Sequence, residues 1–208
     1  MKKLLILLFS ILLLSSPSVF ADDISDFQIE GISIGDSLLD YMTEDEILTE
    51  IQISLSLNDY SHLSEPKKYL DVYLYKDFPT YDKVSFLINN NSLNKYVIDK
   101  NEKYRIVYIR GLIDFNEDFD NCIQERDEIE EVLSKMFLHA EKIKSVYPSS
   151  GDSNGDVNEV SFDFDSGNSI GAYCANYDET WRIKNNRTEG LTVQIKSKEI
   201  FTWLDNYK

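Results

Sequence analysis

The sequence predicts an α+β fold in which an antiparallel sheet is covered by one long helix and by short helices. Segments of alternating apolar and polar residues follow one another without a helical segment between them, which is typical of antiparallel strands. Each of two such groups of strands is preceded by a segment with helical spacing of apolar residues. The 208 residues are 42% hydrophobic, which suffices for one packed core.

The first half contains one short strand, a helical segment and three longer strands. Residues 27–34 alternate and end at Gly35, which predicts a short strand. Two S/T-x-x-[DE] boxes, Ser37 to Asp40 and Thr43 to Glu46, begin a helical segment over 37–52 that is either one broken helix or two short ones. A polar connection over 58–66 then leads to three predicted strands, at residues 70–74, 84–88 and 105–115.

The second half repeats the order of a helix and three strands. The acidic residues of 116–120 precede a helix that carries Cys122 on its apolar face and is predicted to end near 139–144, where basic residues gather. A polar loop over 148–158 follows. The remaining elements are a hairpin with strands at 160–164 and 170–174, a strand at 191–195, and a short helix that Ser197 begins and that runs through Tyr207. One domain over 22–208 is the simplest organisation, with possible halves at 22–115 and 116–208.

Residues 1–21 have the pattern of a signal peptide. Lys2 and Lys3 precede the apolar stretch from Leu4 to Leu14, and a polar segment ends at Ala21, a small residue suited to cleavage before Asp22. The stretch is shorter than the about 20 residues that a membrane-spanning helix needs. No Cys follows the predicted cleavage site, so a lipoprotein anchor is not indicated. No later segment is long and apolar enough to span a membrane. The composition suggests a bacterium, so we expect a periplasmic or secreted protein.

The charge balance is strongly acidic, with 37 Asp and Glu against 21 Lys and Arg and a formal net charge of −16. This balance argues against nucleic-acid binding, because affinity for phosphates requires clustered Lys and Arg. It is compatible with a solvated acidic surface, and also with binding of Ca²⁺ or of a basic protein.

Cys122 and Cys174 are the only cysteines. In an oxidising compartment such a pair is expected to form a disulfide. A loop of this length predicts a stabilisation of about 4 kcal/mol. Two buried thiols and a redox pair are the alternatives, although the spacing is not that of a C-x-x-C motif.

The segment from Gly35 to Leu38 resembles the nucleophile block of the GDSL esterases. The resemblance implies an acyl-enzyme chemistry with Ser37 as nucleophile, Asn58 and Asp59 in the position of the G-x-N-D block, and His62 with Asp59 at the spacing of the base block. Three features depart from the family: Ser56 replaces the Gly, the base block lies far from the C-terminus, and the predicted sheet is not parallel. The alternative is that Gly35 permits a turn and Ser37 caps a helix.

A polar segment has the ligand spacing of an EF-hand loop. Its candidate calcium ligands are Asp152, Asn154, Asp156, Asn158 and Asp163. Val157 stands where the sharp turn requires Gly, and Asp163 is shorter than the usual Glu. An ordinary connecting loop is the alternative, and we expect no cofactor. The two histidines, His62 and His139, lie far apart and have no metal-binding neighbours in the sequence.

The chain contains 13 tyrosines, several of them on predicted strands. These are Tyr73, Tyr75, Tyr104, Tyr108 and Tyr173. They are compatible with a binding face, and also with the ordinary outer face of an antiparallel sheet.

Taken together, the segment from Phe27 to Tyr41 resembles the start of a family of small exported bacterial proteins of unassigned function. Residues 110–113, the helix with Cys122 and residues 133–137, and Cys174 are also similar to that family. The resemblance implies export and a paired Cys, and it implies no catalytic residues. The element order is more loosely similar to envelope-assembly modules of the BamE type and to β-lactamase inhibitor proteins.

These observations favour an exported, non-enzymatic binding or interaction protein, with a GDSL-like serine esterase as the alternative. The partner is an unidentified protein or small ligand, and nucleic acid is not expected.

Overall fold

The structure is a computed structural model that describes residues 24, 27–57, 60–61, 63–90, 99, 102–115, 118–149, 154–185 and 189–205. Its centre is a seven-stranded sheet in which every neighbouring pair of strands is antiparallel. This confirms the predicted α+β class. In spatial order the strands are β3 (Tyr69–Leu74), β4 (Lys83–Asn89), β5 (Ile106–Asp114), β9 (Gly190–Lys196), β8 (Ser169–Asn176), β7 (Asp156–Asp163) and β6 (Glu141–Pro148).

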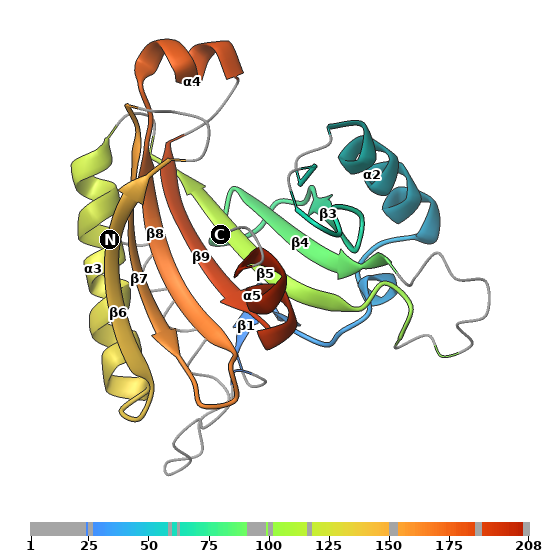
Figure 1. The fold of residues 1–208 in the computed structure, drawn as a ribbon, viewed down its shortest axis with the longest axis horizontal. Helices are drawn as coiled ribbons and strands as arrows, with labels where there is room; N and C mark the ends of the chain where they lie inside the picture. The colour runs from blue at the N-terminus through green and yellow to red at the C-terminus, as the bar shows by residue number, and fades with distance from the viewer. Residues whose placement is uncertain are drawn as a thin grey trace.

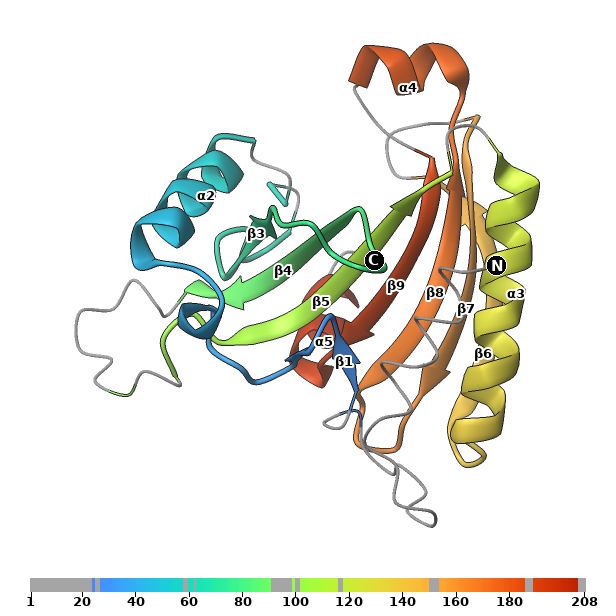
Figure 2. The same cartoon turned by 180° about the vertical axis from the view of Figure 1, so that it is seen from behind.

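Helices lie on both faces of this sheet. α3 (Phe119–Met136) runs along β7, β8 and β9, and α2 (Glu44–Leu57) packs beside β3 (Figure 2). α5 (Lys198–Asp205) lies on the opposite face near β5, and α4 (Glu179–Asn185) projects beyond the end of the sheet (Figure 1). The helices described in the structure include none that is long and apolar enough to cross a membrane.

The main core lies between the sheet and α3, α2 and the N-terminal segment. It includes alternate residues of all strands except β6, such as Val72, Phe86, Ile109, Val160 and Ile195. A smaller cluster covers part of the opposite face, where Ile200 and Trp203 of α5 pack on Tyr69, Leu87 and Val107. We call the face opposite α3 the outer face.

The first predicted strand is instead a tight hairpin. β1 (Gln28–Ile29) pairs with β2 (Ile32–Ser33), and the two residues between them, Glu30 and Gly31, have φ of 55° and 78°. Positive φ at both positions is characteristic of the type I′ turn, one of the two common two-residue hairpin turns. Glu30 is not a typical turn residue, but its carboxylate accepts hydrogen bonds from the amides of Thr80 and Tyr81, and these contacts fix the turn.

The helical segment after the hairpin is divided into two parts, as predicted. A 3₁₀ turn η2 (Leu38–Asp40) precedes α2, and the second box caps α2. The Thr43 amide and hydroxyl donate to the Glu46 carboxylate at 2.8 and 2.6 Å, and the Glu46 amide donates to the Thr43 hydroxyl at 3.4 Å.

α2 also closes one edge of the sheet. The Asp71 amide of β3 donates to the Ser54 hydroxyl at 3.2 Å, and the Tyr73 amide donates to the Glu50 carboxylate at 3.4 Å. Two backbone amides at this edge of the sheet therefore have side chains of α2 as hydrogen-bond partners.

The prediction for residues 139–148 is wrong. α3 ends at Met136, and the residues expected to finish the helix and begin a loop form the edge strand β6. Lys142 and Lys144 alternate onto the face of α3, where both contact the Glu130 carboxylate, at 3.1 and 2.6 Å. The basic residues therefore contact α3 from a strand and do not belong to its last turn.

The capping prediction for Ser197 is also wrong. α5 begins after this residue, but among the described residues its hydroxyl has no hydrogen-bond partner. The Lys198 amide donates instead to the Asn168 side chain at 3.0 Å. The predicted end at Tyr207 lies outside the described residues, and α4 was not predicted.

Candidate binding surface on the outer face of the sheet

Polar and aromatic side chains form a continuous network on the outer face. Strand alternation puts them there, because Leu70 and Val72 point into the main core and Asp71 points away from it. The network, which we call the polar band, crosses β3, β5, β9, β7 and β6. Its members are Tyr60, Asp71, Tyr108, Arg110, Tyr147, Glu159, Gln194 and Lys196.

One end of the polar band is a buried ion pair. Arg110 donates to Asp71, whose side chain is 8% exposed, and the Tyr60 hydroxyl donates to the same carboxylate at 3.0 Å. The guanidinium also lies 5.2 Å from the centre of the Tyr108 ring. Burial lowers the pKa of Arg110, but Asp71, Tyr60 and Tyr108 together raise it well above its ordinary value.

The other end of the polar band converges on Glu159. The Tyr108 hydroxyl donates to Gln194 at 2.5 Å, and the Gln194 amide donates to Glu159 at 2.5 Å. Lys196 contacts the same carboxylate at 3.3 Å, and the Tyr147 hydroxyl donates to it at 2.9 Å. The polar band thus holds a carboxylate at each end and pairs each of them with a cation.

The tyrosines of the polar band are held in the protonated form. Burial is the main reason that the pKa values of Tyr60, Tyr108 and Tyr147 lie above the ordinary tyrosine value, and nearby Asp71 and Glu159 raise them further. At neutral pH these hydroxyls are hydrogen-bond donors. They donate within the polar band, to Asp71, Gln194 and Glu159, and so hold its side chains in fixed positions on the outer face.

The five tyrosines that the sequence suggested for a binding face do not all lie on one face of the sheet. Tyr73, Tyr108 and Tyr173 lie on the outer face, on β3, β5 and β8. Tyr104 is buried in the main core with φ of 56°, and Tyr75 follows β3 and is 71% exposed. Sequence reasoning missed Tyr60, Tyr147 and the charged members of the polar band. The polar positions within the strand alternation were the available signal for the charged ones.

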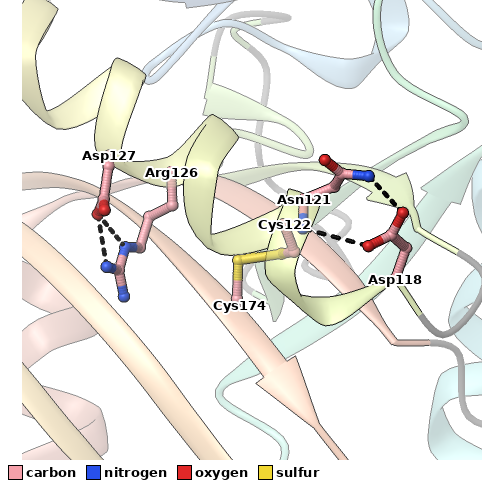
Figure 3. Close-up of a disulfide and its surroundings, with 6 residues drawn as sticks. All are labelled: Asp118, Asn121, Cys122, Arg126, Asp127 and Cys174. Atoms are coloured by element: carbon pink, nitrogen blue, oxygen red, sulfur yellow. Dashed lines mark hydrogen bonds and ion pairs between the residues drawn. A yellow bond between two sulfur atoms is a disulfide. The ribbon is translucent and has the colours of Figure 1, made fainter.

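The cysteines form the predicted disulfide. Cys122 in the first turns of α3 and Cys174 on β8 are joined, with Cα atoms 6.0 Å apart and both side chains buried (Figure 3). Asp118 begins the helix here, because its carboxylate accepts from the Asn121 amide at 3.3 Å. The bond fastens the long helix to the sheet on the main-core side, away from the polar band.

Ser37 lies in a packed turn, as the capping interpretation predicts. It is 1% exposed, its hydroxyl accepts from the Leu39 amide at 3.3 Å, and it donates to the Lys103 carbonyl at 2.7 Å. This geometry favours the cap over an attacking nucleophile, and the sheet is antiparallel where the GDSL esterases have a parallel one. Asn58, Asp59 and His62 lie outside the described residues.

The structure does not bring the candidate calcium ligands together. Asp156, Asn158 and Asp163 lie along the extended strand β7, so the first and last are about 23 Å apart at the usual rise per residue. The loop on which the calcium prediction depended is therefore not formed, because its residues 156–163 are paired with β6 and β8. Asn154 precedes the strand, and Asp152 lies outside the described residues. In the described part of the chain no group of three or more acidic, His or Cys side chains is placed to hold a metal ion.

Comparison of the chain with family models, curated proteins and solved structures found no match. The resemblance to small exported bacterial proteins therefore stays a prediction.

Proposed function

We propose that this chain is an exported, non-catalytic binding protein that recognises its partner through the outer face of the sheet. The observation that supports the proposal is the polar band, in which protonated tyrosines and paired charges extend over five strands. α5 is the described helix that lies over part of this face (Figure 1). Among the tyrosines of this face, Tyr173 is half-buried and Tyr147 is 40% exposed.

Two observations support export. A disulfide suggests a location outside the reducing cytoplasm. The predicted signal peptide, residues 1–21, lies outside the described residues and adds the sequence argument for a periplasmic or secreted protein.

A comparative pull-down tests the proposed face. The purified protein serves as bait in an envelope extract, beside the variants Tyr173→Ala and Tyr75→Ala. Tyr173 lies on the outer face opposite Glu159, whereas Tyr75 lies beyond the end of β3. We expect a partner that wild type and Tyr75→Ala retain and that Tyr173→Ala loses. Equal retention by all three proteins would refute the outer face as the recognition surface.

A fluorophosphonate probe tests the non-catalytic part of the proposal. We expect no labelling, because the Ser37 hydroxyl is buried and engaged in two hydrogen bonds. Labelling of wild type that disappears in Ser37→Ala would establish the esterase alternative.

A further inference from the structure

The edge strand β6 presents an uncovered pairing surface. In the described structure β7 is its one hydrogen-bonded neighbour, so the other side of β6 has no strand beside it. Seven of its eight residues are exposed, and Ser145 is half-buried. Its apolar side chains are accessible too, with Ile143 and Tyr147 each 40% exposed and Val146 67% exposed. An edge strand with accessible apolar residues is a template for pairing with another strand, whereas Lys and Pro residues, here Lys142, Lys144 and Pro148, limit the ways in which such an edge can pair.

We propose that two copies of this chain associate through β6, antiparallel and centred on Ser145, to form one continuous sheet. The argument is the self-complementarity of the strand. Residues that pair across a continuous sheet point to the same face, so a symmetric pairing must be centred on a residue and not between two residues.

The register centred on Ser145 gives favourable neighbours on both faces. On the outer face, Ile143 lies opposite Tyr147 of the second copy, an aliphatic and aromatic pair that occurs twice by symmetry. On the other face, Lys144 lies opposite Val146 of the second copy, so no two like charges are directly opposed. Ser145 meets its own copy at the axis, where its small side chain permits close approach.

The neighbouring registers are worse. Centring on Ile143 opposes Lys142 to Lys144 of the second copy twice, and centring on Lys144 opposes that residue to itself. Centring on Val146 shortens the pairing and leaves Ile143 beyond the paired residues of β6. The lysines thus select one register.

The interface is small, since one strand pair supplies most of it, and interfaces below about 1,200 Å² are typical of weak, transient complexes. The net charge of −16 opposes association further, although salt screens this repulsion. We therefore expect a concentration-dependent dimer. The axis is perpendicular to the sheet, so both outer faces lie on the same side of the dimer.

Sedimentation velocity of the purified protein from about 10 μM to 1 mM measures the association. The critical variants change Val146, which is exposed and opposes Lys144 of the second copy. Val146→Lys should weaken the dimer about tenfold through two opposed lysine pairs. Val146→Glu should strengthen it several-fold. Net charge alone predicts the reverse order, because Val146→Lys makes the protein less negative.

Oxidative cross-linking tests the register. Ser145→Cys should form a covalent dimer, because the two cysteines face each other at the axis, and the native cysteines are buried and already paired. The matched variant Val146→Cys should not form a covalent dimer. Each introduced cysteine lies opposite residue 144 of the second copy, so the Cα atoms of the two introduced cysteines are offset by two residues along the strands and lie farther apart than the about 7 Å that a disulfide spans. A monomer at all concentrations, equal effects of the two Val146 variants, or preferential cross-linking through Val146→Cys would each overturn the proposal.

Discussion

The two edge strands of the sheet differ in how far they are covered by the rest of the protein. At β3, side chains of α2 accept hydrogen bonds from the Asp71 and Tyr73 amides, and five of the six strand residues are buried. At β6, seven of the eight residues are exposed, and the neighbouring helix α3 contacts lysine side chains on one face and leaves the edge open. Since an open edge can pair with another strand, β6 and not β3 is the edge at which we propose association.

The comparison also shows two ways of holding an edge in place. The β3 edge is held by backbone contacts to a helix. The β6 edge is held by its pairing with β7 and also through α3, because the disulfide fixes α3 to β8 and Glu130 of α3 contacts the lysines of β6. The following three predictions separate these contributions.

The largest effect is expected from the disulfide. The double variant Cys122→Ala/Cys174→Ala should lose about 2–4 kcal/mol of unfolding free energy, because the unfolded chain is no longer constrained. Denaturant unfolding measures the loss, and hydrogen exchange should locate the earliest opening in α3 and β6. Reductant should destabilise wild type and leave the double variant unchanged. Equally early hydrogen exchange at the β3 edge would contradict the proposal that the disulfide stabilises the β6 edge in particular.

A medium effect is expected at the β3 edge. Ser54→Ala removes the acceptor of the Asp71 amide and should cost about 1–2 kcal/mol, because a part-buried donor loses its partner. Ser56→Ala is the matched control on the same helix. Its hydroxyl donates to the Ile53 carbonyl at an exposed position, so the loss should stay below about 0.5 kcal/mol. Chemical denaturation of the two variants measures the difference, and equal losses would show that α2 does not protect the edge.

The smallest effect is expected at Glu130. Glu130→Gln weakens two ion pairs and should cost about 1 kcal/mol, whereas Glu131→Gln affects one long, exposed contact to Lys135 and should cost almost nothing. Although burial acts in the other direction, hydrogen bonds from Lys144 and Lys142 lower the pKa of Glu130 below its ordinary value.

The pH dependence of Glu130 follows from that direction. Because the folded pKa is depressed, its contribution is present above the unfolded value of about 4.3 and is lost as the pH falls through the folded pKa. Thermal melts of wild type and Glu130→Gln should therefore converge in acid. A difference that persists well below pH 3 would mean that packing, and not charge, is the cause.

The contrast between the edges also explains what the sequence could predict. Strands such as β3, β4 and β8 were predicted because at least one face of each is buried, which produces apolar alternation or a continuous apolar run. β6 was missed because neither of its faces is buried, so Ile143, Val146 and Tyr147 follow no single period. The polar band was missed for another reason. Its contacts join residues far apart in the chain, as from Asp71 to Arg110 and from Glu159 to Gln194. The disulfide was predicted because two cysteines permit one pairing.

The position of β9 has a consequence for how the chain acquires its structure. β9 is the last strand in sequence, yet it lies between β5 and β8 and pairs with both. A chain whose N-terminal part becomes available first can pair β3 with β4 and β5, and later β6 with β7 and β8. These are two separate three-stranded pieces. Each piece has an open strand until residues 190–196 arrive, and these long-range pairings are the slow ones. Completion of the sheet therefore waits for the last strand, and a chain interrupted before it holds two unjoined pieces, each with an extra exposed edge.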